Sequence, residues 1–184
     1  QAFDLMYKKY KEFLIMMIMK INNDIALSTA DAIVNASNGI GFMGGKSGLE
    51  CRKKGVAESL HFISQGAIEP LAKTKCKKHG LFGYAPGNVF ITPAPNLNCQ
   101  KILHAVTMRF PGSKCKIKTI EKLVPKILSI SEHNNFKSVA IPILGTGTGR
   151  LKIDDVLEIY TEYFQNSKVV FHVYFPFEKS MDIE

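Results

Sequence analysis

The stretch that most constrains the fold is residues 31–48, whose sequence is DAIVNASNGIGFMGGKSG. Ile33 and Val34 form an apolar, β-branched run that is too short for a helix, which predicts a short strand buried in a sheet. A helical pattern begins near Leu49, and the intervening loop has glycines at positions 39, 41, 44, 45 and 48. Glycines allow close approach to the backbone, and free N–H groups at a helix N-terminus favour negative charge. The stretch therefore predicts an anion-binding loop, with a phosphate-bearing ligand as the first hypothesis.

A second glycine-rich loop, residues 145–149, follows the apolar run of residues 138–144. Along the whole chain, strands alternate with helices, which predicts a three-layer α/β/α sandwich with a mixed, mostly parallel sheet of six strands. In such α/β folds, ligands bind beyond the carboxyl ends of the strands. Two glycine-rich loops at that edge suit a diphosphate better than a single phosphate.

The expected elements fit one domain at residues 15–184, preceded by an N-terminal extension at residues 1–14. Residues 1–12 have the apolar spacing of one helical face, and Gly55 and Pro125 interrupt later helical patterns. Gly55 is a potential break in the first of these helices, and Pro125 predicts a kink or a late start in the third. We expect strands at residues 13–21, 33–34, 88–92, 101–106, 138–144 and 168–175, and helices at residues 49–65, 67–78, 117–128 and 153–164.

The composition is that of a globular protein, with 46% hydrophobic and 22% charged residues. The formal net charge of +8 is compatible with nucleic acid as a partner or with an anionic small ligand. The lysine clusters at residues 52–54 and 73–78 are interpreted as solvated surface. The apolar residues 13–21 are too few to span a membrane, so no membrane partner is expected.

The four cysteines form no C-x-x-C pair, which indicates reduced thiols and a cytoplasmic location rather than disulfides. Cys76 and His79 have the spacing of half a zinc site, but no second pair stands at ligand spacing. We therefore expect no metal site, and nothing in the sequence calls for a cofactor.

Common nucleotide-binding signatures fit the first glycine loop poorly. GIGFMG matches the G-x-G-x-x-G pattern, but no acidic residue stands about twenty positions later to hold a ribose. GGKS is similar to the end of a P-loop, but the required earlier glycine is replaced by Ile40. These differences exclude a P-loop NTPase and disfavour a dinucleotide-dependent dehydrogenase.

Five segments stand in an order and spacing that resemble a known family. They are NNDI, DAIVNASN, the GG of the first loop, ITPAPNL followed by ILHAV, and SVAIPILGTGTG. The chain resembles a macro domain over about residues 16–176. The resemblance implies the three-layer fold and a ligand, ADP-ribose, bound either free or as a modification on a macromolecule.

The resemblance also implies roles for individual residues. Asp24, with Ile25 beside it, would accept from the adenine amine, and Asn38 would reach the distal ribose. The two glycine loops would contact the diphosphate, through Gly44, Gly45, Lys46 and Ser47 in the first and Gly145, Thr146, Gly147, Thr148 and Gly149 in the second. The alternative for Asn35 and Asn38 is that they cap the end of the strand. The alternative for the glycines is that they form tight turns.

The catalytic groups of hydrolytic macro domains are missing at the matching positions. Many such domains have an Asp just after the first loop, where this chain has Ser47. Another branch uses a lysine after the third strand and an aspartate in the second loop, but this chain has Thr92-Pro93 and residues 147–149 there. The Cys and His set of a zinc-containing branch is not found either.

Catalytic residues therefore stay unassigned, with Asn38 and Lys46 as candidates. His104 is interpreted as a hydrogen-bonded core histidine and Cys51 as a packing residue. We expect ADP-ribose binding; the alternatives are hydrolysis of ADP-ribose from proteins or nucleic acid, and removal of phosphate from ADP-ribose-1''-phosphate. Contact with nucleic acid is a secondary hypothesis, because no basic strand surface interleaved with aromatic residues is recognisable.

Overall fold

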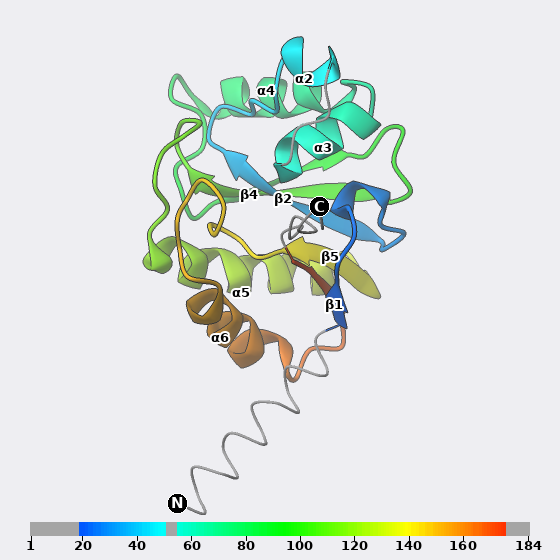
Figure 1. Ribbon diagram of the computed structural model, residues 1–184, viewed down its shortest axis with the longest axis vertical. Coiled ribbons are helices and arrows are strands. Elements are labelled where there is room, and N and C mark those ends of the chain that lie inside the picture. The colour runs from blue at the N-terminus through cyan, green and yellow to red at the C-terminus, as the bar shows by residue number, and fades with distance from the viewer. Residues whose placement is uncertain (1–18, 51–54, 176–184) are drawn as a thin grey trace, which may run out of the picture.

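The computed structural model describes residues 19–50 and 55–175 (Figure 1). The expected helical face at residues 1–12 and most of the expected strand at residues 13–21 lie outside the described residues, as does Cys51. The end of that strand is described as β1 (Met19–Ile21).

The six strands form one mixed sheet, as the sequence predicts. Neighbouring strands are parallel except β3 (Val89–Pro93) and β4 (Lys101–Met108), which are antiparallel. Only residues 94–100 connect β3 to β4, whereas parallel neighbours need long crossover connections. The order in the sheet is β1, β6 (Val170–Tyr174), β5 (Ser138–Pro142), β2 (Ala32–Asn38), β4 (Lys101–Met108) and β3 (Val89–Pro93).

Helices cover both faces of the sheet (Figure 1). Alternate residues of β2 point to the two faces, so Val34 packs in one core with Ile120 of α5 (Ile117–His133). Ile33 packs in a second core with Leu60 of α3 (Val56–Ile63) and Ile68 of α4 (Ile68–His79). The three-layer prediction is confirmed. One layer holds α2 (Ser47–Glu50), α3 (Val56–Ile63) and α4 (Ile68–His79), and the other holds α5 (Ile117–His133) and α6 (Ile153–Phe164).

Strand β2 is longer than predicted, because it continues through the polar residues that were expected to end it. Asn35 is fully buried, and its Nδ2 lies 3.2 Å from Nδ1 of His104 on β4. The Thr107 hydroxyl donates to the Ser37 carbonyl at 3.2 Å. The neighbouring strand thus pairs with buried polar groups of β2, the Asn35 amide nitrogen and the Ser37 carbonyl.

One helical expectation is confirmed by the structure and one is corrected. The helical pattern at residues 49–65 is interrupted at Gly55, the potential break, since α2 ends at Glu50 and Gly55 is the N-cap residue of α3. Helix α5 begins at Ile117 and continues to His133, so the late start at Pro125 is wrong. Burial of Leu123 and Val124 just before this proline holds the helical stripe against the sheet.

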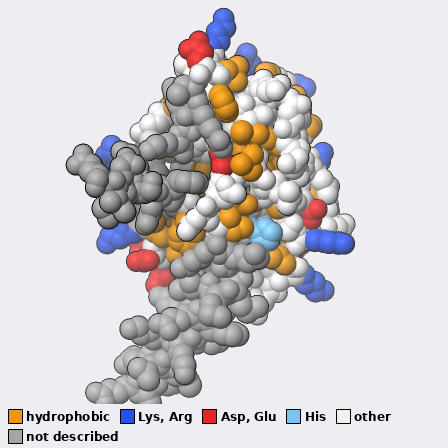
Figure 2. Space-filling view, turned by 45° about the vertical axis from the view of Figure 1, so that its right-hand side comes forward, with side chains coloured by type: hydrophobic (Ala, Val, Ile, Leu, Met, Phe, Trp, Pro, Cys, Tyr) orange, Lys and Arg blue, Asp and Glu red, His pale blue; other side chains and the backbone are white. Residues whose placement is uncertain are grey.

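The parallel strands β2, β4, β5 and β6 all run in one direction, so their carboxyl ends meet at one edge of the sheet. Within the described ranges, no helix has the length and apolar character needed to cross a membrane. On the face seen in Figure 2, Lys and Arg side chains stand around the margin, and hydrophobic side chains gather around one acidic side chain near the centre.

Candidate functional site

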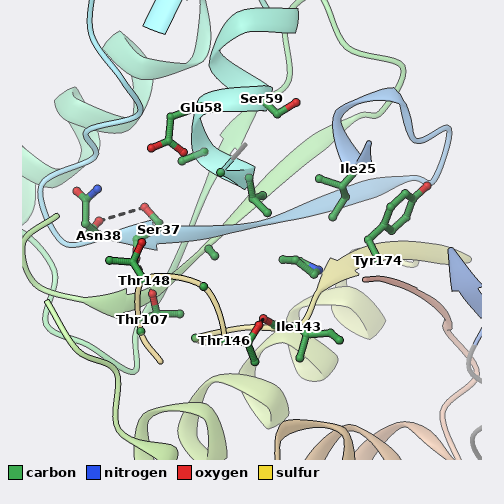
Figure 3. A pocket seen from close by; sticks show the side chains of 18 of the residues that line it. Ile25, Ser37, Asn38, Glu58, Ser59, Thr107, Ile143, Thr146, Thr148 and Tyr174 are labelled. Carbon is green, nitrogen blue, oxygen red and sulfur yellow. Dashed lines mark hydrogen bonds between the residues drawn. The ribbon is translucent and has the colours of Figure 1, made fainter. Parts of the chain in front are cut away.

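A cavity of about 760 Å³ lies at the carboxyl ends of the parallel strands (Figure 3). This volume falls in the usual range for small-molecule sites. The short 3-10 helix η1 (Ile25–Leu27) and the first turn of α3 line one side, and the second glycine loop lines another. The side chains that line the cavity include those of Asp24, Ile25, Asn38, Phe42, Glu58, Thr107, Ile143, Thr146, Thr148 and Tyr174.

Asp24 lies at the wall of the cavity and is held in place by two hydrogen bonds. It is the N-cap of η1, where its Oδ1 accepts from the Ala26 N–H at 2.9 Å. Its Oδ2 accepts from the Ser59 hydroxyl of α3 at 2.5 Å. Ile25 beside it is buried and also lines the cavity. The carboxylate is therefore fixed between two elements rather than free to rotate.

Asn38 lines the cavity, but its side chain also closes the turn after β2. Its Oδ1 accepts from the N–H groups of Ile40 at 3.3 Å and Phe42 at 3.1 Å. Its Nδ2 donates to the Phe42 carbonyl at 2.7 Å. Asn38 therefore caps the end of β2, as the alternative interpretation predicted. Asn35 does not line the cavity, because its side chain points into the core toward His104.

The first glycine loop binds an anion, but that anion is the protein's own Glu69. The Glu69 Oε2 accepts from the N–H groups of Met43 at 2.7 Å and Gly45 at 3.0 Å. His61 Nε2 lies 2.9 Å from the Gly45 carbonyl and secures the other side of the loop. Lys73 forms an ion pair with Glu69 at 2.6 Å.

Burial alone would raise the pKa of Glu69, but the hydrogen bonds from Lys73, Gly45 and Met43 outweigh it and hold the pKa below its ordinary value. The Gly45 N–H, which was expected to meet a diphosphate, is therefore already occupied by Glu69. The residues that do not line the cavity, against expectation, are Gly44, Gly45, Lys46 and Ser47.

The second glycine loop lines the cavity along its whole length, from Gly145 to Gly149. Gly145 has φ +76°, and a Cβ there would lie 2.8 Å from Leu151 Cδ1, so glycine is required. The loop is pinned because the Leu151 N–H donates to the Gly145 carbonyl at 3.0 Å and the Cys115 N–H donates to the Gly149 carbonyl at 3.2 Å. Within the described ranges, the N–H groups of residues 146–149 donate to no protein acceptor.

Tyr160 of α6 fixes the entry to this loop. Its hydroxyl donates to the Pro142 carbonyl at 2.6 Å and accepts from the Leu144 N–H at 3.1 Å. Burial raises the pKa of Tyr160 well above its ordinary value, so the hydroxyl stays protonated and keeps its donor. The unpaired N–H groups that follow are thereby presented on a rigid base.

Glu58 is a cavity residue that the sequence reasoning missed. It lies in the first turn of α3, next to Ser59, and its half-buried side chain lines the cavity (Figure 3). The signal that was available is its position three residues after Gly55, the potential helix break. A break there makes Glu58 a first-turn residue at the sheet edge rather than a mid-helix residue.

A family model described as Macro domain matches residues 34–160, which is more than half of the chain. The chain belongs to the macro domain family. Relatives with similar sequences include an uncharacterized protein of Aquifex aeolicus, 30% identical over 137 residues, or 73% of this chain and 72% of that protein. Another is the O-acetyl-ADP-ribose deacetylase of Salmonella newport, 27% identical over 163 residues, or 84% of this chain and 85% of that enzyme.

Solved structures show the same fold at lower sequence identity. The macrodomain of Mycobacterium tuberculosis DarG superimposes with a TM-score of 0.71 at 22% identity, covering 85% of this chain and 95% of that one. Thermosipho africanus DarTG in complex with ADP-ribose has a TM-score of 0.70 at 22% identity, covering 87% of this chain and 42% of that one. The macro-domain fold predicted from the five sequence segments is confirmed.

In this macro domain, His104 is a core residue. It is fully buried, stacks on Phe90 with ring centroids 4.5 Å apart, and has its Nε2 2.9 Å from the Thr92 hydroxyl. Burial lowers the pKa of His104 to about 3, so the ring is neutral at physiological pH. Its interpretation as a hydrogen-bonded core histidine is confirmed.

The cysteines that the structure describes are packing residues. Burial raises the pKa of both Cys76 and Cys99 to about 11, which keeps these thiols protonated and unreactive. Among residues 19–50 and 55–175, no group of three or more His, Cys, Asp or Glu side chains is arranged to hold a metal ion.

The sequence reasoning also missed the cavity residues supplied by β4 and β6. The predicted β4 ended at Val106, two residues before its observed end, which left out Thr107 and Met108. Tyr174 and Phe175 line the cavity where β6 ends. Parallel strands share one carboxyl edge, so the last residues of every predicted parallel strand were candidates for the site.

Proposed function

We propose that this macro domain binds ADP-ribose, free or as a modification, in the cavity at the sheet edge. The observation that carries the proposal is the row of unpaired N–H groups at residues 146–149, which opens into the same cavity as the fixed carboxylate of Asp24. Backbone N–H groups in such a loop attract the oxygens of a diphosphate. Asp24 offers an acceptor for the adenine amine, with apolar Ile25 and Val56 beside it.

The proposal assigns the diphosphate to the second loop alone. Gly44, Gly45, Lys46 and Ser47 have no ligand role in it, since Glu69 holds the first loop and none of these residues lines the cavity. The ligand-binding residues that remain from the sequence prediction are Asp24, Ile25, Asn38, Gly145, Thr146, Gly147, Thr148 and Gly149.

Calorimetric titration with ADP-ribose tests this function. Asp24→Ala is expected to weaken binding at least tenfold and to reduce the preference for adenine over other bases. Asp155→Asn is the matched control, because Asp155 is an exposed carboxylate on α6 that does not line the cavity. Equal affinities for the wild type and Asp24→Ala would contradict the assignment of Asp24.

Hydrolysis of the same ligand is the alternative activity. It is supported by the likeness to an O-acetyl-ADP-ribose deacetylase and by Glu58, a carboxylate within the cavity. A time course of ADP-ribose release from a modified protein, or of acetate release from O-acetyl-ADP-ribose, separates binding from catalysis. The Gly149→Ala variant, whose loop is disrupted, provides the background rate.

Contact with nucleic acid is a second candidate function, supported by exposed aromatic side chains near the cavity. Phe82 is 63% exposed and Phe110 is 46% exposed. Arg109 joins them, since its Nη1 donates to the Phe82 carbonyl at 3.2 Å. Pro111, which follows Phe110, lines the cavity, so a strand stacked on these rings would lie beside a bound ADP-ribose. Stacking on aromatic rings next to cations is how many proteins hold single strands.

Fluorescence titration with a labelled single-stranded RNA tests the second candidate. Binding is expected to weaken as salt rises and to fall at least about fivefold in Phe82→Ser, since stacking on one ring contributes roughly 1–3 kcal/mol. Asp24→Ala should leave RNA binding unchanged. Equal RNA affinities for the wild type and Phe82→Ser would contradict the proposal that RNA stacks on this aromatic surface.

A further inference from the structure

We propose that three cations beside the second glycine loop, Lys114, Lys116 and Arg150, draw an anionic ligand into the cavity by raising its association rate. These three residues are called the cationic rim below. They act on the approaching diphosphate through space, whereas the residues that line the cavity contact it. The inference rests on the proposed binding of ADP-ribose.

The charges that line the cavity oppose the entry of such a ligand. Asp24 and Glu58 are the charged side chains among the described residues of the lining, which include no Lys, Arg or His. The diphosphate of ADP-ribose is doubly ionised at neutral pH, so both carboxylates repel it. The N–H groups of the second loop attract it only at short range, because they are dipoles rather than net charges. Attraction over a longer distance therefore requires cations outside the lining.

The two lysines of the rim are tied to the second loop by the residue between them. The Cys115 N–H donates to the Gly149 carbonyl at 3.2 Å, which holds residues 114–116 against the end of the loop. Cys115 is buried, whereas Lys114 and Lys116 on either side of it are exposed. Both lysine side chains therefore point to solvent next to the loop.

Arg150 reaches the same place from the other end of the loop, which it directly follows. It is exposed, and its backbone is fixed because its N–H donates to the Gly147 carbonyl at 3.1 Å. A Cβ on Gly145 would lie 2.8 Å from Leu151 Cδ1 and 3.1 Å from Cys115 Sγ, so the segments on the two sides of the loop pack together under this glycine. The three cations are thus carried by the segments that support the proposed diphosphate loop.

The charges of the rim are not neutralised by the fold. Within the described part of the chain, none of the three side chains makes an ion pair or a hydrogen bond. Lys152 is not counted in the rim, because Asp154 and Asp155 follow it at the start of α6 and offset its charge. None of the rim residues lines the cavity. Free cations outside a site act mainly on the association rate, which such fields raise by roughly tenfold or more at low salt.

Stopped-flow mixing with ADP-ribose tests the inference by measuring kon and koff separately. The chain has no Trp and Tyr174 lines the cavity, so tyrosine fluorescence reports entry of the ligand. At about 10 mM salt, where the Debye length is about 30 Å, Lys114→Gln/Lys116→Gln should lower kon at least about threefold and leave koff within about twofold of wild type. Adding Arg150→Gln should lower kon further. At about 1 M salt, where the Debye length is about 3 Å, the kon values should converge.

The matched control is Lys137→Gln/Lys168→Gln, which removes the same charge at the opposite edge of the sheet. Both lysines are exposed and stand just before β5 and β6, whose amino ends point away from the cavity. This variant should keep the wild-type kon at both salt concentrations. Lys114→Arg/Lys116→Arg should also keep it, because the charge is retained. Thermal unfolding checks that these surface substitutions leave the fold intact.

The outcomes separate this inference from the proposed function. Equal kon values for the rim variant and the matched control at low salt would overturn the inference and leave ADP-ribose binding intact. A loss that appears in koff instead of kon would also overturn it, since the lysines would then contact the bound ligand. Absence of calorimetric binding to ADP-ribose in the wild type would instead refute the proposed function.

Discussion

Glu69 shows how one side chain changes the meaning of a sequence motif. The first loop presents the N–H groups of Met43 and Gly45 as an anion site should, and a carboxylate from α4 occupies both. The side chain is buried, so losing its charge leaves loop donors less well paired. The loop is thus a structural junction between β2 and α4 rather than a ligand contact.

Replacing Glu69 by Gln is expected to destabilise the fold by about 2 kcal/mol at pH 7, because hydrogen bonds to a charged acceptor are the stronger kind. The folded pKa lies below the ordinary value of 4.5, so the contribution is present above pH 4.5 and is lost as pH falls through the folded pKa. Urea unfolding at pH 7 and at pH 3.5 should show the difference from wild type shrinking. Glu132→Gln, at an exposed carboxylate on α5, should have no comparable effect at either pH.

His104 makes a second pH-dependent contribution in a different window. Its pKa is about 3 in the fold against an ordinary 6.5, so the unfolded chain binds a proton first as pH falls. Stability should therefore decline below pH 6.5, by about 1 kcal/mol between pH 6 and pH 5 from this residue alone. His104→Gln should flatten the dependence in that interval, where Glu69 does not yet contribute. An unaltered slope in the variant would contradict the assignment.

Among the elements, the second glycine loop contains glycines that differ in how closely their neighbours pack against them. A Cβ on Gly149 would lie 2.7 Å from Cys115 Cβ, whereas a Cβ on Gly147 would meet nothing within 4 Å. Gly149→Ala is expected to destabilise the protein by about 1–3 kcal/mol through overpacking, and Gly147→Ala by less than about 1 kcal/mol. Urea unfolding of the two variants measures this directly. Equal losses would show that the loop is not pinned at Gly149 in the way described.

The elements that could be predicted from the sequence are those determined by a local hydrophobic pattern. The apolar stripe of α5 and the strand leading to Gly145 were predicted because hydrophobic periodicity reports burial. The end of β2 was misjudged, since the partners of Asn35 and Ser37 lie about seventy residues away on β4. Glu58 and Glu69 were missed for the same reason, because what each carboxylate faces depends on how α3 and α4 pack on the loop.

At the scale of the whole molecule, the cavity lies between two separate hydrophobic cores. Asp24 belongs to the side packed with α3 and α4, where Ile25 and Leu60 share one core. The second glycine loop belongs to the other side, since Cys115 and Leu144 pack in the core with α5 and α6. A ligand that contacts both Asp24 and the loop therefore connects the two layers across the edge of the sheet.

This arrangement predicts that bound ADP-ribose raises the free energy of unfolding of the whole domain. Contacts with Asp24 and with the second glycine loop should each contribute to that increase. At a free ligand concentration of 100 times Kd, binding adds about 2.7 kcal/mol, which for a domain of this size raises Tm by about 5–10 °C. The matched ligand is inosine diphosphate ribose, which lacks the adenine amine. At the same concentration it should raise Tm less in the wild type, because a carbonyl oxygen then replaces the amine from which Asp24 accepts. In Asp24→Ala the two ligands should give the same small shift, since the group that distinguishes them is gone. Thermal unfolding with both ligands checks this, and equal shifts in the wild type would place the base away from Asp24.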